Sequence, residues 1–377
     1  MNSINKLEVW LNDRKVGVLA NTNQRVTAFE YDSHWIADGY SISPFSLPLE
    51  KKVFVSKMEP FDGLFGVFAD SLPDGWGRLL ADRILLSQKI NPNDVSPLQR
   101  LAIVGDSGMG ALSYKPEQKL TGEIQEEDLD KLAYACKKIL EQDYSEDLDT
   151  LFALGGSSGG ARPKILTEYQ GEPWLIKFPS TYDRDNIGYE EFCYAECAKE
   201  CGIQVEETKL FASKKCSGYF GVRRFDRKQG DSKKKIHMIT VSGLLETSHR
   251  IPNLDYHTLM KLTWIMTKDY SEVEQMYRRM CFNVFAHNRD DHSKNFSFLY
   301  DEENGRWKLA PAYDMTYSSS IGGEHATCVD GNGRNPGIRE VVNVGETAKI
   351  PKAKAEEIAR EIQFKVNNCL NNFLLSY

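Results

Sequence analysis

Short runs of alternating apolar and polar residues dominate the first part of the chain. The first run breaks at Asn12-Asp13, which predicts a β-hairpin because strands alternate and tight turns favour Asn and Asp. Apolar residues at helical spacing predict one helix among these strands. The expected elements are a hairpin over 7–19, strands over 29–36 and 52–56, a helix over 80–90, and a Gly-rich turn followed by a strand within 101–114. Together they predict an N-terminal α/β module over about residues 1–117.

The middle of the chain alternates helical periodicity with short β-type runs. One helix is predicted where Leu129, Leu132 and Cys136 share a face. The expected elements are helices over 126–140, 146–154 and 189–203, and strands over 164–167, 174–178, 208–213 and 219–227. The basic segment 228–237 is predicted to be a solvated loop rather than a site for phosphate or nucleic acid. This pattern predicts a β-rich lobe over about residues 118–230.

Helical periodicity takes over in the last part of the chain. The expected elements are helices over 253–267, 271–288 and 350–374, and a hairpin over 296–315. The hairpin is predicted because apolar residues alternate on both sides of Glu303-Asn304-Gly305. A β-rich region followed by a helical region, over about residues 231–377, places the chain in the α+β class.

Composition narrows the class of protein. The chain has 377 residues, of which 41% are hydrophobic and 27% charged, enough to bury a large core without disulfides or metals. The formal net charge of −7 argues against a protein that binds nucleic acid by bulk positive charge. Eight cysteines without paired spacing indicate a reducing compartment. The sequence shows neither an apolar leader nor an apolar run of about 18 residues, so a soluble, cytoplasmic protein is expected, with no membrane as partner.

Candidate chemistry concentrates in the stretch HNRDDHSKNF, residues 287–296. Asp290 is followed five positions later by Asn295, the spacing by which protein kinases supply a catalytic base and a metal ligand. Asp314 follows after the predicted hairpin, and carboxylate and amide oxygens suit Mg²⁺. Two common residues at one spacing are weak evidence, but the order of strand, loop, hairpin and Asp strengthens it.

A cradle for phosphate is the other part that phosphoryl transfer requires. The segment SSGGARPK, residues 157–164, lies between a predicted helix and a predicted strand, and its glycines allow backbone N–H groups to approach phosphate oxygens. Lys177 lies in an apolar strand and needs a partner if it is buried. Glu191, near the start of the next helix, can be that partner. The alternatives are a solvent-facing Lys177 and a Glu191 that complements the helix dipole.

A metal-dependent hydrolase is a second interpretation of residues 287–296. Its candidate ligands are His287, Asp290, Asp291 and His292. This interpretation leaves the 157–164 segment and Lys177 without a role. A serine hydrolase is disfavoured because no GxSxG elbow is predicted: residues 155–159 match the letters of the motif, but they follow a predicted helix and precede a predicted strand, whereas the elbow joins a strand to a helix.

Two further signals are interpreted as structural. Cys193, Cys197 and Cys201 would spread their thiols about 12 Å along one helix, so one tetrahedral ion could not bind all three, and buried small side chains are expected. The Gly-rich turn within 101–114 matches neither a Walker A loop nor GxGxxG. A turn with a structural role is therefore favoured over a phosphate loop.

The ordered set of motifs resembles the HipA family of bacterial serine/threonine kinases, the toxins of HipA–HipB toxin–antitoxin systems. The stretches that resemble the family's N-terminal module are LNDRKVGVL, FEYDSHWI, SPFSLPL, FADSLPDGWGR and GDSGMGAL. The stretches that resemble the family's kinase core are GGSSGGARPK, IKFP, EEFCYAECAKECGI, RRFDR, NRDDHSKNFSF and LAPAYDM. The resemblance covers nearly the whole chain. It implies a protein-kinase-like, two-lobed fold, with a β-rich N lobe and a helical C lobe, preceded by an N-terminal α/β module.

The resemblance implies roles for individual residues. Asp290 matches the catalytic base, and Lys294 would help to neutralise developing phosphate charge. Asn295 and Asp314 match the Mg²⁺ ligands. The residues implied to bind ATP are Ser157, Ser158, Gly159, Gly160, Ala161, Lys164, Lys177, Glu191, Arg223, Phe225 and His292. Autophosphorylation at Ser157 or Ser158 would eject the loop and switch the kinase off.

Three positions depart from the family pattern. Asp291 stands where the family often has Gly, and it adds a charge beside the metal ligands. Arg223 stands where a family member has Glu at the connection between the lobes. Ser158 is a second serine in the phosphate loop. Neither kinase chemistry nor the family pattern requires Asp291.

The function implied by the resemblance is that of an ATP- and Mg²⁺-dependent protein serine/threonine kinase. Its substrate would be a translation component of the aminoacyl-tRNA synthetase class, whose phosphorylation arrests growth. The implied partner is a small HipB-like DNA-binding antitoxin, through which DNA is contacted indirectly. The competing class is a kinase-like scaffold that transfers no phosphate and serves as a corepressor with the antitoxin.

Overall fold

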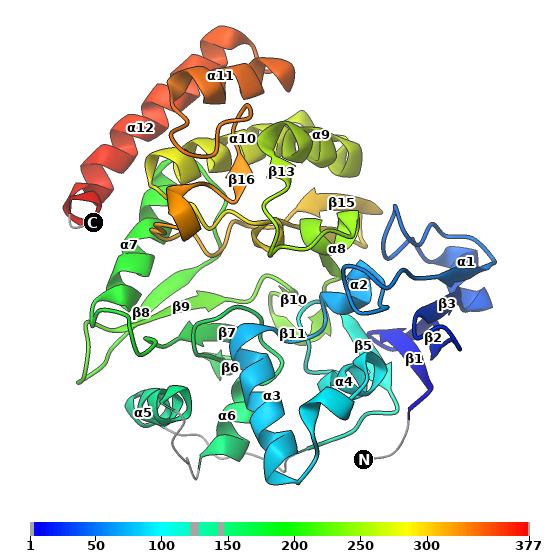
Figure 1. Ribbon diagram of the computed structural model, residues 1–377. Helices are drawn as coiled ribbons and strands as arrows, with labels where there is room; N and C mark the ends of the chain where they lie inside the picture. Colours follow the sequence, from blue (N-terminus) through cyan, green and yellow to red (C-terminus); the bar gives the residue numbers. More distant parts are fainter. Residues whose placement is uncertain (1–3, 121–127, 142–146, 376–377) are drawn as a thin grey trace. The chain divides into compact units, whose positions relative to one another are not determined.

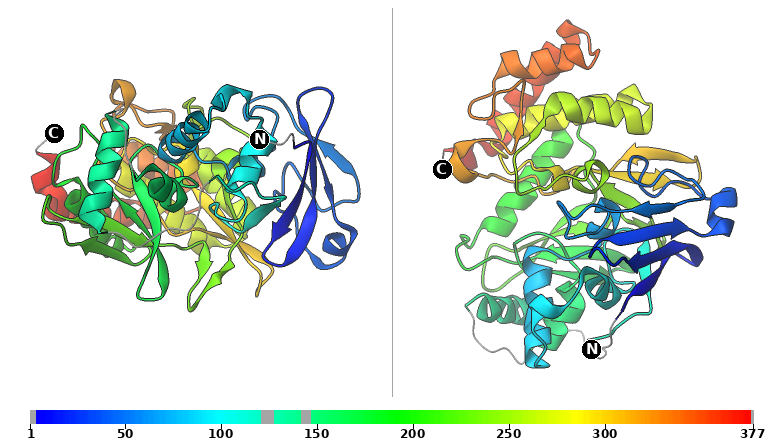
Figure 2. Two further views of the ribbon diagram at one scale, coloured as in Figure 1. Left: turned by 90° about the horizontal axis from the view of Figure 1, so that it is seen from below. Right: turned by 45° about the vertical axis from the view of Figure 1, so that its right-hand side comes forward.

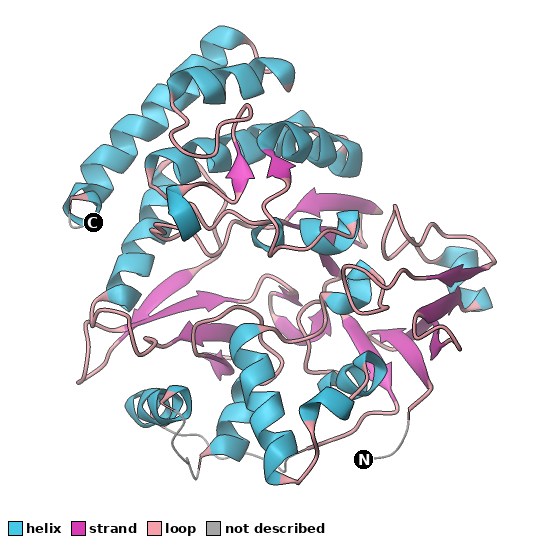
Figure 3. Cartoon of the chain, in the orientation of Figure 1, coloured by secondary structure: helices cyan, strands magenta, loops and turns pink. Residues whose placement is uncertain are grey.

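The structure, a computed structural model, describes residues 4–120, 128–141 and 147–375. Figures 1 and 2 trace the chain in three views, and Figure 3 marks its helices and strands. Parts of two expected helices, residues 126–127 and residue 146, lie outside the described residues. Within the described ranges, no helix is long and apolar enough to cross a membrane.

The chain folds into two compact units. The first unit contains Met1–Gly188 and Leu210–Thr247, and the second contains Tyr189–Lys209 and Ser248–Tyr377. Most strands belong to the first unit, whereas the second unit is largely helical (Figure 3). Both classes of element are present, as the α+β prediction requires.

The first unit begins with a five-stranded antiparallel sheet in the order β4-β3-β2-β1-β5. Its strands are β1 (Lys6–Leu11), β2 (Arg14–Asn21), β3 (Thr27–Tyr31), β4 (Val53–Val55) and β5 (Leu112–Lys115). The predicted hairpin is confirmed, and Asn12 adopts a positive φ of 51° in its turn. Leu7, Val9 and Leu11 alternate along β1 and are buried, so one face of the sheet carries core residues.

Four helices accompany this sheet. They are α1 (Ser33–Asp38), α2 (Gly66–Ala69), α3 (Gly75–Ser87) and α4 (Pro97–Val104). The strand expected over 29–36 is half wrong, because the chain leaves β3 at Tyr31 and enters α1. Asp32 causes this change: its carboxylate accepts from the N–H of His34, the hydrogen bond of a helix N-cap.

A second sheet, which lies in the first unit except for the first two residues of β8, has the order β6-β7-β9-β8. Its strands are β6 (Lys164–Tyr169), β7 (Glu172–Lys177), β8 (Thr208–Phe211) and β9 (Tyr219–Arg223). The helices α5 (Leu129–Leu140) and α6 (Leu148–Gly155) pack with it. Their buried residues form one core with Trp76 and Leu80 of α3. The predicted N-terminal module and β-rich lobe therefore share a hydrophobic core.

The basic segment 228–237 is largely a hairpin and not the solvated loop that was predicted. Strand β10 (Arg227–Lys228) pairs with β11 (Asp231–Lys235). The unit ends with β12 (Met238–Thr240) and α8 (Val241–Leu245). The alternation of charged residues with Ser232 and Ile236 gave no apolar signal for a strand, so the sequence pattern missed this hairpin.

The second unit is built around a group of helices. They are α9 (Tyr256–Thr267), α10 (Tyr270–Phe285), α11 (Ile338–Thr347) and α12 (Lys352–Leu374), together with most of α7 (Ile187–Glu200). Helix α12 lies along α10 and α11 (Figure 1) and buries Ile358, Ile362 and Val366. Cys197 on α7 and Cys201 just after it are buried as expected, and Cys193 is half-buried.

Short strands complete the second unit. They are β13 (Leu254–Asp255), β14 (Ser297–Asp301), β15 (Arg306–Leu309) and β16 (Thr327–Cys328). The predicted hairpin over 296–315 is confirmed by the antiparallel pair β14–β15. Strands β13 and β16 pair in parallel, which ties the start of α9 to the segment after the hairpin.

Candidate active site

The Ser/Gly segment, residues 157–164, joins α6 to β6 in the first unit. Ser158 is fully buried, and its hydroxyl donates to the carbonyl of Gly155 at 2.6 Å. Ser157 is half-buried, and its hydroxyl donates to the carbonyl of Ser107 at 2.9 Å. The two serines therefore have different surroundings, and Ser157 is the more accessible one.

The start of α3 holds the backbone of the same segment. The carboxylate of Asp74 accepts from the N–H of Gly160, and the N–H of Trp76 donates to the carbonyl of Gly160 at 2.9 Å. The indole N–H of Trp76 donates to the carbonyl of Lys164 at 3.1 Å. A Cβ on Gly75, whose φ is +43°, would lie 2.4 Å from the Gly160 carbonyl oxygen, so glycine is required there.

Two lysines lie opposite each other beside this segment. Lys164 opens β6 and Lys177 ends β7, and the two are partners across the antiparallel strands. Lys164 is 5% exposed and donates to the carbonyl of Gly159 at 2.6 Å, while the Lys177 ammonium lies 5.6 Å from the ring centroid of Phe220. Like charges directly opposite each other repel, and burial of an ammonium group is costly. Two neighbouring ammonium groups suit an anionic ligand.

The remaining residues predicted to bind nucleotide are distributed over both units. Arg223 ends β9, and its guanidinium lies 3.9 Å from the carboxylate of Glu172. Phe225 is half-buried in the RRFDR stretch that follows β9, and Ala161 is exposed within the Ser/Gly segment. Glu191 is 2% exposed on α7 and belongs to the second unit.

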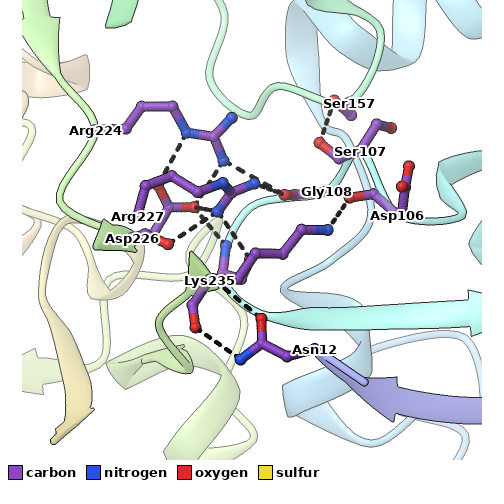
Figure 4. A network of polar contacts seen from close by, with 10 residues as sticks. Asn12, Asp106, Ser107, Gly108, Ser157, Arg224, Asp226, Arg227 and Lys235 are labelled. Carbon is purple, nitrogen blue, oxygen red and sulfur yellow. Dashed lines mark hydrogen bonds and ion pairs between the residues drawn. The ribbon is translucent and has the colours of Figure 1, made fainter. Parts of the chain in front are cut away.

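Asp226, in the RRFDR stretch, is a buried carboxylate with several donors (Figure 4). Arg224 donates to it at 2.7 and 2.9 Å, Arg227 at 2.8 Å, and the N–H of Gly110 at 2.7 Å. Burial raises the pKa of Asp226, but the charges of the two guanidiniums outweigh burial and hold the pKa well below its usual range. Both guanidiniums also donate to the carbonyl of Gly108. Asp226 thereby connects the RRFDR stretch, which links β9 to β10, to the Gly-rich turn.

The Gly-rich turn connects this ion cluster to the Ser/Gly segment. In this turn, the carbonyl of Ser107 accepts a hydrogen bond from the hydroxyl of Ser157, and the carbonyl of Asp106 accepts one from the ammonium of Lys235 (Figure 4). The backbone N–H of Lys235 in turn donates to the side chain of Asn12 at 3.0 Å. The turn is therefore structural, as predicted, but it supports the serine of the expected phosphate loop. The sequence pattern gave no sign of this support.

In the second unit, residues 290–295 form a tight loop that presents Asp290 to solvent. The Asp290 side chain is 65% exposed, and its carboxylate lies 3.9 Å from Nε2 of His292. Its carbonyl accepts from the side-chain amide of Asn295 at 2.6 Å. Nδ1 of His292 accepts from the N–H of Lys294, and its ring lies 5.4 Å from that of His249. The Asp290 side chain is thus exposed to solvent on a backbone that its neighbours hold.

Backbone contacts bring Asp314 to the same loop. The Tyr313 hydroxyl donates to the carbonyl of Lys294 at 2.6 Å, and the side-chain amide of Asn288 donates to the carbonyl of Asp314 at 3.4 Å. Asp314 has a positive φ of 52°, which is uncommon for a residue with a side chain and typical of functional sites. Within the second unit, Asp290, Lys294 and Asp314 therefore lie on joined segments.

The donor set of this loop suits a hard cation. The amide nitrogen of Asn295 is bound to the Asp290 carbonyl, so its oxygen is the atom that could ligate a metal. Together with the Asp314 carboxylate, this makes an oxygen pair of the kind that Mg²⁺ prefers. A transition-metal site is less compatible, because Asp291 is fully buried among protein donors. Within the described residues, no group of three or more His, Cys, Asp or Glu is arranged to hold a metal ion.

A β-rich unit with a Ser/Gly segment and a largely helical unit with an Asp-x4-Asn loop define a kinase-like protein. Comparison with known families agrees with this class. A model of the HipA-like C-terminal domain matches residues 156–370, and a model of the HipA N-terminal domain matches residues 7–115. The chain therefore belongs to the HipA family, as its motifs suggested.

Similar proteins come from bacteria. "Putative kinase Y4dM" of Sinorhizobium fredii is 24% identical over 84% of this chain and 78% of its own. "Putative kinase Y4mE" of the same organism is 25% identical over 83% and 77%. A chain in the Shewanella oneidensis MR-1 complex of HipA, HipB and operator DNA is 17% identical, with a TM-score of 0.72 over 98% of this chain and 91% of that chain. This likeness confirms the predicted two-lobed, kinase-like fold.

Proposed function

We propose that the protein is an ATP- and Mg²⁺-dependent protein serine/threonine kinase. The observation that carries the proposal is the loop of the second unit, where the exposed Asp290 side chain lies on a backbone joined to Asn295 and Asp314. The paired lysines Lys164 and Lys177 beside the Ser/Gly segment support nucleotide binding in the first unit. Both parts are required for phosphoryl transfer.

The residues divide the reaction between them. Asp290 accepts the proton of the substrate hydroxyl, whose oxygen attacks the γ-phosphorus of ATP while ADP leaves. Lys294 offsets the charge that develops on the transferred phosphoryl group. Lys164, Lys177 and residues 157–161 would line the site of the phosphates. Asn295 and Asp314 would hold Mg²⁺, which neutralises phosphate charge when bound. His292 orients the loop through the N–H of Lys294.

Further parts of the proposal concern ATP placement and autophosphorylation. The strand link around Arg223 and Phe225 would meet the adenine, and Glu191 would support the phosphate-binding lysine. Ser157 is the better candidate for inhibitory autophosphorylation, because Ser158 is fully buried. We assign these roles within an N-terminal module over 1–117, an N lobe over 118–230 and a C lobe over 231–377.

The partner and the substrate are proposed from the family. The Shewanella protein was solved with HipB and operator DNA, and a HipB-like antitoxin is the corresponding partner for this chain, with DNA reached through it. An aminoacyl-tRNA synthetase is the proposed class of substrate, and its phosphorylation would arrest growth in the cytoplasm.

Labelled ATP tests the activity. Wild type with Mg²⁺ is expected to transfer label to protein, while Asp290→Asn and Asp314→Asn lose transfer by at least about 100-fold, the order expected for a catalytic residue. The matched control is Glu302→Gln, which neutralises an exposed carboxylate in the β14–β15 turn and should transfer label normally. Mass spectrometry should map autophosphorylation to Ser157.

The outcomes separate the candidate functions. Absence of nucleotide binding by wild type would contradict the kinase. Nucleotide binding without transfer would favour the non-catalytic corepressor. A stoichiometric transition metal in the purified protein, found by elemental analysis, would favour the metal-dependent hydrolase.

A further inference from the structure

Asp291, the residue for which the sequence gave no role, is the most strongly bound carboxylate of the catalytic loop. It is fully buried. Its Oδ2 accepts from the hydroxyl of Tyr256 at 2.8 Å and from Nδ1 of His325 at 2.9 Å. Its Oδ1 accepts from the N–H of Thr327 at 3.1 Å. Both oxygens of Asp291 are therefore bound by protein donors.

Burial of such a carboxylate is costly unless donors replace its water. Tyr256 is well suited as a donor, because burial and the charge of Asp291 raise its pKa well above the usual value and keep the hydroxyl protonated. These three donors come from the start of α9 and from the segment at β16. The parallel pairing of β13 with β16 holds those two segments together. Asp291 thus fixes the catalytic loop to a prebuilt frame.

The backbone on both sides of Asp290 is bound to the same frame. The hydroxyl of Thr327 donates to the carbonyl of Asp291 at 2.5 Å, and the N–H of Ala326 donates to the carbonyl of Arg289 at 3.0 Å. Residues 289 and 291 are therefore both held, and the path of residue 290 between them is determined. This leaves the Asp290 side chain exposed on a backbone that has little freedom.

A chain of hydrogen bonds continues from Asp291 to Asp314. The hydroxyl of Tyr256, which donates to Asp291, accepts from the side-chain amide of Asn283 at 2.9 Å. The oxygen of that amide accepts from the side-chain amide of Asn288 at 3.0 Å, and Asn288 also donates to the carbonyl of Asp314. Tyr256, Asn283 and Asn288 are all buried. One network therefore contacts both the base-bearing loop and the backbone of the proposed metal ligand.

We propose that Asp291 is a positioning residue, which sets the geometry between Asp290 and Asp314 through Tyr256, Asn283 and Asn288. This inference rests on the proposed kinase function for its kinetic consequence. Asp291 touches neither ATP nor the reacting hydroxyl in this role. It anchors the loop through the contacts of its own carboxylate.

Two matched variants, each of which deletes one buried tyrosine hydroxyl, test the proposal. Tyr256→Phe removes the hydrogen bond to Asp291, while Tyr277→Phe removes an equally buried hydroxyl that donates to the carbonyl of Ala355 in the same unit. We expect Tyr256→Phe to lower kcat by roughly 10- to 100-fold with little change in the KM for ATP, because a small misplacement of catalytic groups has effects of this order. Tyr277→Phe should lower the Tm without lowering kcat.

A second pair deletes a hydroxyl on the other side of the loop. Thr327→Val removes the hydrogen bond to the Asp291 carbonyl, and Thr263→Val removes a buried hydroxyl that donates to the Leu259 carbonyl within α9. Thr327→Val should lower kcat and should speed amide hydrogen exchange in the peptide 287–296. Thr263→Val should do neither at a comparable loss of Tm.

Hydrogen exchange keeps this inference separate from the kinase proposal. If wild type transfers no phosphate but Tyr256→Phe and Thr327→Val still speed exchange in 287–296, the function is wrong and the anchoring of the loop stands. If kcat falls equally in Tyr256→Phe and Tyr277→Phe, or exchange in 287–296 is unchanged by Tyr256→Phe and Thr327→Val, the positioning role is wrong.

Discussion

Two buried carboxylates, Asp226 and Asp291, have comparable roles in the two units. Asp226 accepts hydrogen bonds from two guanidiniums and from the N–H of Gly110. Asp291 accepts hydrogen bonds from the hydroxyl of Tyr256, a histidine ring and a backbone N–H. Each joins segments that are far apart in the sequence beside a predicted site residue. A buried charge of this kind specifies one arrangement, because its loss leaves several donors without an acceptor.

Lys235 beside Asp226 gives a testable pH dependence. Burial, with the charge of Arg227, lowers the pKa of Lys235 from 10.5 to about 8. Between these values the unfolded chain binds more protons than the folded protein, so the contribution of Lys235 to stability rises with pH. The quantity to measure is the difference in the free energy of urea unfolding between wild type and Lys235→Met. This difference should increase from about pH 7.5 to about pH 10.5, a range that spans the two pKa values.

The control for this measurement is Lys233, which is exposed on the same strand. The difference between wild type and Lys233→Met should stay flat over this pH range. A flat difference for Lys235→Met as well would show that its ammonium is solvated in the folded protein.

At the residue scale, sequence predicted the chemical groups but not their supports. Asp290 and Asn295 stand out because their spacing is local and matches a known loop. The support of Ser157 by Ser107 joins positions 50 residues apart, and that of Asp226 by Gly110 joins positions 116 apart. No periodicity within one segment carries such contacts. Asp291 was visible as an anomaly, but its explanation required the fold.

At the scale of elements, hydrophobic periodicity predicted most helices and hairpins. The hairpins β1–β2, β6–β7 and β14–β15 have clear turn residues between alternating runs. The helix α1 was missed because it is short and its apolar residues, Trp35 and Ile36, also suit a strand. The N-cap Asp32 was the signal that could have found it. Helix α3 begins five residues earlier than predicted because its first turn is rich in glycine, which lowers helix propensity.

The start of α3 gives a prediction for one element contact. Gly75 and Gly171 both have positive φ, of 43° and 78°, so alanine is strained at either position. At Gly75 a Cβ would also meet the carbonyl oxygen of Gly160 at 2.4 Å, whereas at Gly171 nothing lies within 4 Å. Gly171→Ala should therefore cost about 1–2 kcal/mol of unfolding free energy, and Gly75→Ala clearly more.

Urea unfolding and ATP titration check this difference. On the proposed function, Gly75→Ala should also weaken ATP binding, because the start of α3 holds the backbone of the Ser/Gly segment. Gly171→Ala should bind ATP as wild type does. Equal losses of stability in the two variants would mean that α3 and the Ser/Gly segment can separate at little cost.

At the scale of the whole molecule, the two compact units do not follow the three predicted segments. The core of the first unit includes Trp76 and Leu80 of the predicted N-terminal module and Ile165 and Trp174 of the predicted N lobe. A boundary in the sequence pattern near residue 117 is therefore not a boundary of packing. Motif order could not reveal this, because a shared core depends on which faces meet in three dimensions.

Two units predict two steps in equilibrium unfolding. Leu80→Ala removes a fully buried side chain of the first unit, and Ile362→Ala removes one of the second. Each should destabilise its own unit by about 2–5 kcal/mol and shift one of two urea transitions. Hydrogen exchange by mass spectrometry would assign each transition to its residues. A single transition that both variants shift equally would show that the units unfold as one.

Trp76 gives the protein an internal optical probe. Its indole is 1% exposed, and its N–H is hydrogen-bonded to the carbonyl that ends the Ser/Gly segment. Indole emission depends on the polarity around the ring and on this hydrogen bond. Movement of the Ser/Gly segment away from α3 should therefore shift the wavelength of maximum tryptophan emission, and Trp76→Phe should remove that shift. Nucleotide titration or modification of Ser157 could then be followed in real time without a label.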